Sequence, residues 1–238
     1  MKNIFLLSIA TILLLAGCTS SDEATTGDGT FSIYAPVSRT TNSGSNTLWA
    51  MGDAINILHA ESEGSSYVAD GAFQLKDIST GRFVGTLGEN LSSGASYDWY
   101  ASYPYTTPLS APNGAFVIGN TAGASQIQSG NNSSAHMAGE HMPLVGKASA
   151  VAAERAPMLT MKNAASAAKF VIHNALDESI TIKSIELTAP NHDLTGSFNI
   201  DFANTSKISY TPIETSDKAM LSPSTTSSIA LSDVSIGV

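Results

Sequence analysis

The chain has one cysteine in 238 residues, and its 11 Lys and Arg side chains are outnumbered by 20 Asp and Glu. A single cysteine excludes an intrachain disulfide framework and a zinc site built from several thiolates. The net charge of −9 argues against a protein that tracks nucleic-acid phosphates, because such proteins need a concentrated basic face. We therefore expect no nucleic-acid partner.

Charged residues are also scarce, at 13% of the chain, whereas hydrophobic residues make up 42%. Long solvated helices are normally rich in Glu, Lys and Arg, so this shortage favours β-structure with small polar residues on its outer faces. The apolar content is sufficient for a core, which argues against disorder of the whole chain. The composition predicts an all-β protein, and the length suits one large domain or two small ones.

The N-terminus has the pattern of a secretory signal peptide. A short basic segment, Met1–Asn3, precedes an apolar run at Ile4–Leu15. This run is too short to span about 30 Å of hydrocarbon as a helix. It ends in Leu15-Ala16-Gly17-Cys18, which resembles the lipobox of bacterial lipoproteins. The resemblance implies removal of residues 1–17 by cleavage between Gly17 and Cys18, acylation of Cys18, and anchoring of the mature chain in the outer-membrane lipid.

The residues that follow Cys18 are polar and offer little to pack, so we interpret residues 18–29 as a lipidated tether. Asp22 and Glu23 stand at the fourth and fifth positions after Cys18. This placement resembles the surface-export signal of some Gram-negative lipoproteins. It implies a lipoprotein that is exposed on the surface of the outer membrane.

Period-two patterns predict strands along the rest of the chain. Apolar and polar residues alternate at Phe31–Ile33, Ile55–Ile57, Tyr97–Tyr103 and Phe198–Phe202. Short alternating segments that are separated by Gly, Asn, Ser and Pro are typical of β-sandwiches. The alanine-rich segment Ala164–Ala168 allows one short helix.

Changes in composition predict the domain organisation. Asn113–Ser134 is rich in Gly, Ser, Asn and Ala, and we interpret it as an exposed excursion. The alanine-rich stretch Ala148–Pro157 is the expected boundary, which places a first β-sandwich domain at 30–155 and a second at 156–238. The second unit holds few strand patterns, so we expect it to be short or incomplete.

Four blocks of sequence occur in a characteristic order. Trp49–Ile55 follows the pattern W-x-x-G-D-x-I, and Tyr97–Tyr105 is a tyrosine-rich strand that ends in Pro-Tyr. Met158–Asn163 is followed by the alternating Ala168–Ile172, and Leu194–Phe198 has the pattern L-x-G-x-F. Together with the lipobox, these blocks resemble the fimbrillin family, the lipoprotein pilins of certain Gram-negative anaerobes. The third block departs from the family, which often has His where this chain has Asn.

The resemblance implies two tandem β-sandwich domains of the transthyretin-like or Greek-key type and a structural or accessory adhesin role in a fimbria. It also implies that an arginine-specific protease cuts between Arg39 and Thr40, which removes the strand carrying Phe31 and Ile33. A terminal strand of the next subunit would fill the vacated groove by donor-strand exchange. The implied partners are other fimbrial subunits and host or bacterial surface receptors. The alternative is that Arg39 is a solvated loop residue without a role.

Residue types that carry catalytic or metal chemistry form no recognised site. The spacing of His136, Glu140 and His141 matches neither of the helical zinc motifs, and we interpret this segment as an exposed polar loop. We interpret His59 as a surface residue at the polar edge of a strand. No phosphate loop, dinucleotide fingerprint or paired carboxylates stand out in the sequence. We expect no metal site, no cofactor and no enzymatic activity.

Trp49, Trp99 and Tyr103 leave a second function open. Aromatic side chains at alternating positions pack in a core, whereas exposed ones can stack on sugar rings. The second arrangement would make the protein a surface glycan-binding lipoprotein.

Overall fold

A computed structural model describes residues 29–36, 49–105, 115–118, 125–128, 142–172, 182–201, 209–223 and 234–237. All regular secondary structure within these ranges is β-strand, and the predicted all-β class is confirmed. The described part of the chain has no helix with the length and apolar character of a membrane span. The strands are β1 Phe31–Tyr34, β2 Ala54–Glu61, β3 Val68–Asp77, β4 Arg82–Gly85, β5 Ser96–Tyr103, β6 Ala115–Ile118, β7 Ser125–Gln128, β8 Leu144–Ala152, β9 Thr160–Asn163, β10 Ala167–Phe170, β11 Ile185–Thr188, β12 Thr195–Asp201, β13 Ser209–Ser216, β14 Lys218–Pro223 and β15 Val234–Gly237.

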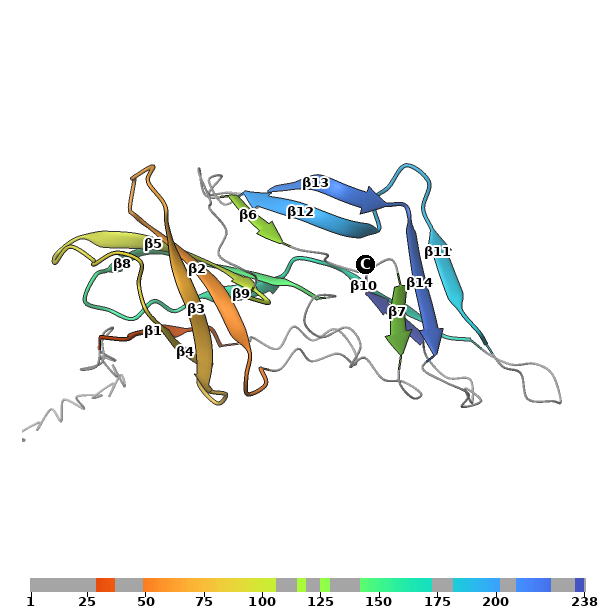
Figure 1. The fold of residues 1–238 in the computed structure, drawn as a ribbon, viewed down its shortest axis with the longest axis horizontal. Helices are drawn as coiled ribbons and strands as arrows, with labels where there is room; N and C mark the ends of the chain where they lie inside the picture. The colour runs from red at the N-terminus through yellow and green to blue at the C-terminus, as the bar shows by residue number, and fades with distance from the viewer. Residues whose placement is uncertain are drawn as a thin grey trace, which may run out of the picture.

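The largest sheet has seven antiparallel strands in the order β1-β4-β3-β2-β5-β8-β9 (Figure 1). The sheet curls until its first strand meets the segment that leads into its last. Tyr34 forms a parallel bridge with Met158. The Tyr34 N–H donates to the Pro157 carbonyl at 2.9 Å, and the Leu159 N–H donates to the Tyr34 carbonyl at 2.7 Å. The sheet therefore almost closes on itself at the end of β1.

The core of this sheet is formed by the inward members of the alternating patterns. The core includes fully buried side chains from β1, β2, β3, β4 and β5, among them Ile33, Ile55, Ile57, Phe73, Phe83 and Trp99. The predicted strands at Phe31–Ile33, Ile55–Ile57 and Tyr97–Tyr103 are confirmed as β1, β2 and β5. The large apolar side chains of these strands recur at every second position on the inward face, which is why the sequence pattern predicted them.

Three smaller sheets contain the remaining strands, in the orders β10-β15, β11-β14-β7 and β13-β12-β6 (Figure 1). β6 pairs with β12 and β7 pairs in parallel with β14, although both lie within the predicted excursion Asn113–Ser134. The expectation that this whole segment is exposed is wrong, because Gln126 and Gln128 are buried. β9 in turn belongs to the seven-stranded sheet. Strands that precede residue 155 in the sequence thus pair with strands that follow it. The division at 155/156 into two tandem sandwiches stays a prediction.

The short helix allowed at Ala164–Ala168 is not formed. The Ala164 N–H donates to the Pro143 carbonyl at 2.8 Å, at the end of the β8–β9 ladder. β10 begins at Ala167 and pairs with β15. Without an apolar stripe at helical spacing, these alanines follow the tertiary pairing rather than their helix propensity.

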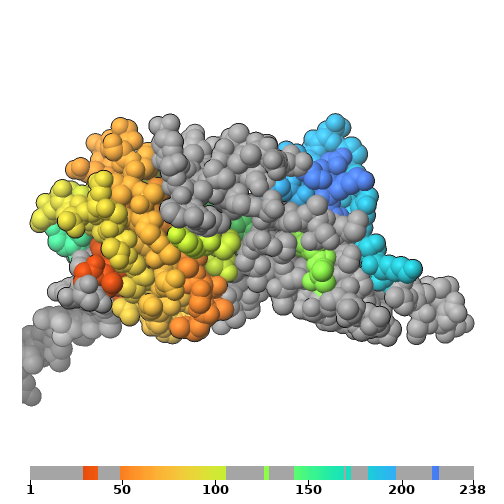
Figure 2. Space-filling view, viewed as in Figure 1, coloured from red at the N-terminus to blue at the C-terminus, as the bar shows by residue number. Residues whose placement is uncertain are grey.

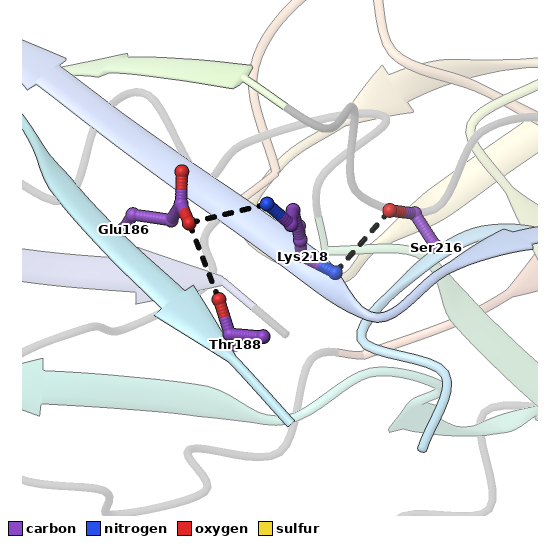
Figure 3. A network of polar contacts seen from close by, with 4 residues as sticks. All are labelled: Glu186, Thr188, Ser216 and Lys218. Atoms are coloured by element: carbon purple, nitrogen blue, oxygen red, sulfur yellow. Dashed lines mark hydrogen bonds and ion pairs between the residues drawn. The ribbon is translucent and has the colours of Figure 1, made fainter. Parts of the chain in front are cut away.

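A polar network joins β11 to β14 on the surface (Figure 3). Glu186 Oε1 lies 3.4 Å from Lys218 Nζ and accepts a hydrogen bond from the Thr188 hydroxyl at 3.3 Å. The Lys218 N–H donates to the Ser216 hydroxyl at 3.2 Å, where the chain turns from β13 into β14. These groups are exposed, so solvent screens the ion pair and the network serves mainly to fix the strand register.

Candidate functional site at the N-terminal edge strand

β1 is the first strand of the seven-stranded sheet and pairs with β4 in the register Phe31↔Gly85 and Ile33↔Phe83. It has only four residues, yet its inward side chains belong to the core. Phe31 is 2% exposed and Ile33 is 0% exposed. The Phe31 ring stacks on the Trp99 ring, with centroids 5.0 Å apart and an interplanar angle of 14°. The predicted strand at Phe31 and Ile33 thus plugs a core built by other strands.

The end of β1 is held through the backbone of Ala35. The Ala35 N–H donates to the Gly81 carbonyl at 2.8 Å, and the Ala35 carbonyl accepts a hydrogen bond from Trp49 Nε1 at 2.7 Å. Gly81 closes the β3–β4 hairpin with a φ of 65°, and a Cβ there would lie 2.5 Å from the Ala35 oxygen. Only glycine therefore permits this close approach of the hairpin to β1.

Trp49 is itself held between two rings and a turn. Phe83 and Tyr103 lie edge-on to its indole, with centroids 5.0 and 5.2 Å away. The Tyr103 hydroxyl donates to Asp53 Oδ1 at 3.0 Å, and Asp53 Oδ2 accepts the Ala50 N–H at 2.7 Å. Burial, together with the hydrogen bond to Asp53, raises the pKa of Tyr103 to about 12 and keeps its hydroxyl a donor. The W-x-x-G-D-x-I block thus orients Trp49 toward the end of β1.

A pocket of about 440 Å³ opens at the other end of β1. Its walls include Gly29, Phe31, Leu87, Leu91 and Glu154. In Figure 2 a small red patch from residues 29–36 is visible beside yellow residues. The pocket therefore borders the residues at the beginning of β1.

Glu154 fastens the turn at the rim of this pocket. Its Oε1 accepts the Gly94 N–H at 2.8 Å and the Ser93 hydroxyl at 3.0 Å. The Gly94 backbone bond, with the bonds from its own backbone and from Ser93, lowers the pKa of Glu154 below its ordinary value of 4.5. The ionised carboxylate is therefore favoured in the folded chain, since these donors bind it better than the neutral acid.

We expect acidification to loosen this turn. A depressed pKa contributes stability above the unfolded value of 4.5, and that contribution is lost as the pH falls through the lower folded value. Hydrogen exchange of the Gly94 amide should therefore accelerate, beyond its intrinsic pH dependence, in a step that begins as the pH falls below 4.5 and ends below the folded pKa of Glu154. Glu154→Gln should abolish this step. A step centred above 4.5, or one that persists in the variant, would contradict the assignment.

The tryptophans do not form a sugar-binding platform. Trp49 is 6% exposed and Trp99 is 1% exposed. Neither ring has a free face for stacking, so the alternative of a glycan platform is wrong for these two residues. The interpretation of both as core residues is confirmed.

The interpretation of His59 as a surface residue is also wrong. His59 is buried, its ring lies 5.1 Å from the Trp99 ring, and its Nδ1 lies 2.9 Å from Asp70 Oδ2. The second oxygen of Asp70 accepts the Gly88 N–H at 2.7 Å. The alternation of His59 with Ile55 and Ile57 was the signal for this inward position. The pair ties β2 and β3 to the loop that follows β4.

The remaining candidates from the sequence lie outside the described residues. These are Gly17 and Cys18 of the lipobox, the proposed cleavage pair Arg39 and Thr40, and the segment that holds His136 and His141. Among the described residues, no three His, Cys, Asp or Glu side chains are grouped closely enough to hold a metal ion.

No protein-family model and no curated protein matches the chain. Two crystal structures resemble its fold. A proposed cell adhesion protein from Bacteroides ovatus superposes with a TM-score of 0.56 at 14% identity, over 87% of this chain and 76% of that one. A proposed cell adhesion protein from Bacteroides uniformis superposes with a TM-score of 0.54 at 13% identity, over 89% and 76%. At these identities the likeness concerns the fold.

Proposed function

We propose that this chain is a surface-exposed outer-membrane lipoprotein that acts as a structural subunit or accessory adhesin of a fimbria. In this proposal a protease cuts after Arg39, β1 leaves the sheet, and a strand from another subunit takes its place. The observation that carries the proposal is β1 itself. It is a short edge strand next to the N-terminus, and it plugs the core with Phe31 and Ile33.

Loss of β1 would open a groove that is suited to another strand. The edge of β4 would present unpaired N–H and C=O groups, which bind an added strand by β-augmentation. The places of Phe31 and Ile33 would become apolar slots beside Phe83 and Trp99. Burying one large apolar side chain is favourable by about 1.5–3 kcal/mol, so the empty groove favours an incoming strand with apolar residues at alternate positions.

Two further observations support a role at the cell surface. Two crystal structures of similar fold come from proteins that are proposed to act in cell adhesion. The lipobox at Cys18 supplies an anchor in the outer membrane. The other subunits of a fimbria and a host or bacterial surface receptor are the proposed partners, and the proposal requires no cofactor or enzymatic step of this chain.

The test is digestion of the mature chain with an arginine-specific protease. The chain has three arginines, Arg39, Arg82 and Arg155. Arg82 lies in β4, whereas Arg155 is exposed in the turn after β8 and is the competing site. We expect a new N-terminus at Thr40 and SDS-resistant ladders in electrophoresis. The background variant Arg155→Lys removes cleavage that would start a fragment at Ala156.

Arg39→Gln in the Arg155→Lys background is the matched control, and it should remain uncleaved and monomeric. Ladders that form equally well from the Arg39→Gln variant would contradict protease-triggered exchange. Cleavage at Thr40 without any ladder, or resistance to cleavage, would exclude a shaft subunit and leave an anchor or tip adhesin.

A further inference from the structure

The end of β1 is held from three directions by groups that contact its backbone. β4 and its hairpin turn hold one edge, through Arg82 and the Gly81 carbonyl. The segment Pro157–Leu159 holds the opposite edge of Tyr34 with two hydrogen bonds. The third contact is a side chain, because Trp49 Nε1 donates to the Ala35 carbonyl at 2.7 Å.

The Trp49 contact is buried and has its own support. The indole is clamped edge-on by Phe83 and Tyr103, and Tyr103 is hydrogen-bonded to Asp53 in the turn that carries Trp49. Its position therefore does not depend on β1 alone. A donor fixed in this way loses little freedom on bonding, and breaking the bond leaves a polar group in an apolar site.

We propose that Trp49 is the positioning residue of strand exchange: its indole N–H latches the backbone of β1 and limits how readily the strand leaves. This inference rests on the proposed function, in which β1 is the strand that is exchanged. The latch recognises a carbonyl oxygen rather than a side chain. Any strand that occupies the place of β1 in the same register can therefore accept the same hydrogen bond.

The test distinguishes a Trp49 that latches β1 from a Trp49 that only packs in the core. It uses the full mature chain and needs neither proteolytic cleavage nor assembly of subunits. Trp49→Phe keeps an aromatic ring between Phe83 and Tyr103 but removes the donor. Native-state hydrogen exchange is measured at the amides of Tyr34 and Ala35, which are bonded to Pro157 and Gly81. We expect exchange at these two amides to accelerate about fivefold, which is the usual size of one lost hydrogen bond.

Ile57→Val is the matched control. Ile57 is 1% exposed in β2, which is not paired with β1, and this substitution has a global cost similar to that of one hydrogen bond. It should accelerate the slowest amides of β2 and β5 and leave those of Tyr34 and Ala35 unchanged. If Trp49→Phe gives the same pattern as Ile57→Val, Trp49 is only a core residue and the latch is excluded.

A second variant covers the case in which Trp49→Phe does not fold. Site-specific replacement of Trp49 by benzothienylalanine keeps the bicyclic ring and exchanges the N–H for sulfur. Faster exchange at Tyr34 and Ala35 supports the latch, and unchanged exchange overturns it. Because neither variant needs proteolysis, failure of the latch is distinct from failure of the fimbrial proposal, which the ladders decide.

Discussion

Replacing both Phe31 and Ile33 with alanine is expected to detach β1 and to destabilise the chain by about 5 kcal/mol or more. Truncation of a buried Phe costs about 3–5 kcal/mol and that of a buried Ile about 2–5 kcal/mol. The two side chains share one cavity, so the sum is an upper bound. A loss of this size is a large fraction of the stability of a typical domain.

Urea unfolding followed by tryptophan fluorescence measures this effect directly. Both tryptophans of the chain contact β1, since Trp99 stacks on Phe31 and Trp49 bonds to Ala35. Detachment should therefore shift the emission to the red before any urea is added. The single variants should fall between the double variant and the parent chain.

Ile127→Ala and Val171→Ala are suitable controls for this series. Both side chains are exposed, at 57% and 54%, so each substitution should change stability by less than about 0.5 kcal/mol. An unshifted spectrum and an unchanged urea midpoint in the double variant would mean that β1 contributes nothing to the core. Removal of β1 would then leave no apolar slots for an incoming strand, and strand exchange would lose its driving force.

Replacing Asp70 with alanine should cost about 1–3 kcal/mol, because it leaves a buried histidine without its partner and a half-buried backbone N–H without its acceptor. These groups are the His59 ring, 2.9 Å from Asp70 Oδ2, and the Gly88 N–H, 2.7 Å from Oδ1. The loss should appear as a lower urea midpoint with an unchanged dependence on urea concentration.

Asp70→Asn is the isosteric control, since it keeps the shape and one acceptor oxygen, and its cost should be smaller. His59→Phe combined with Asp70→Leu should recover part of the loss, because apolar replacements of matched shape remove the unpaired imidazole. Equal stability of Asp70→Ala and the parent chain would show that the pair is dispensable.

Local patterns were sufficient to predict β1, β2 and β5 but not the pairing of distant segments. In these strands large apolar residues alternate with smaller or polar ones, and this alternation is visible in a single sequence. β6 and β7 have four residues each between Gly- and Ser-rich stretches, and their partners β12 and β14 come much later in the chain. Nothing local distinguishes such strands from loops, since their stability comes from the partner.

The candidate site likewise contains residues that the sequence could place and contacts that it could not. Phe31 and Ile33 could be placed in an N-terminal strand because they alternate with polar or half-buried neighbours. The bond from Trp49 to Ala35 could not be predicted, because it depends on how the sheet curls and on the Tyr103–Asp53 contact. The prediction for His59 was wrong for a different reason. It relied on the polar character of the side chain and not on its position on the inward face of the strand. A buried histidine is stable when it has a partner such as Asp70.

The contacts of Tyr34 with Pro157 and Leu159 bear on the order in which the protein folds. β1 precedes the other described strands in synthesis, yet one of its two edges is completed by residues made well past the middle of the chain. Closing so long a loop is entropically costly, and contacts between distant segments slow folding. The hairpins of β2, β3 and β4 can form early from local contacts. This strand is made early but is therefore among the last to be fixed, and this edge of the sheet stays incomplete until the segment before β9 has folded.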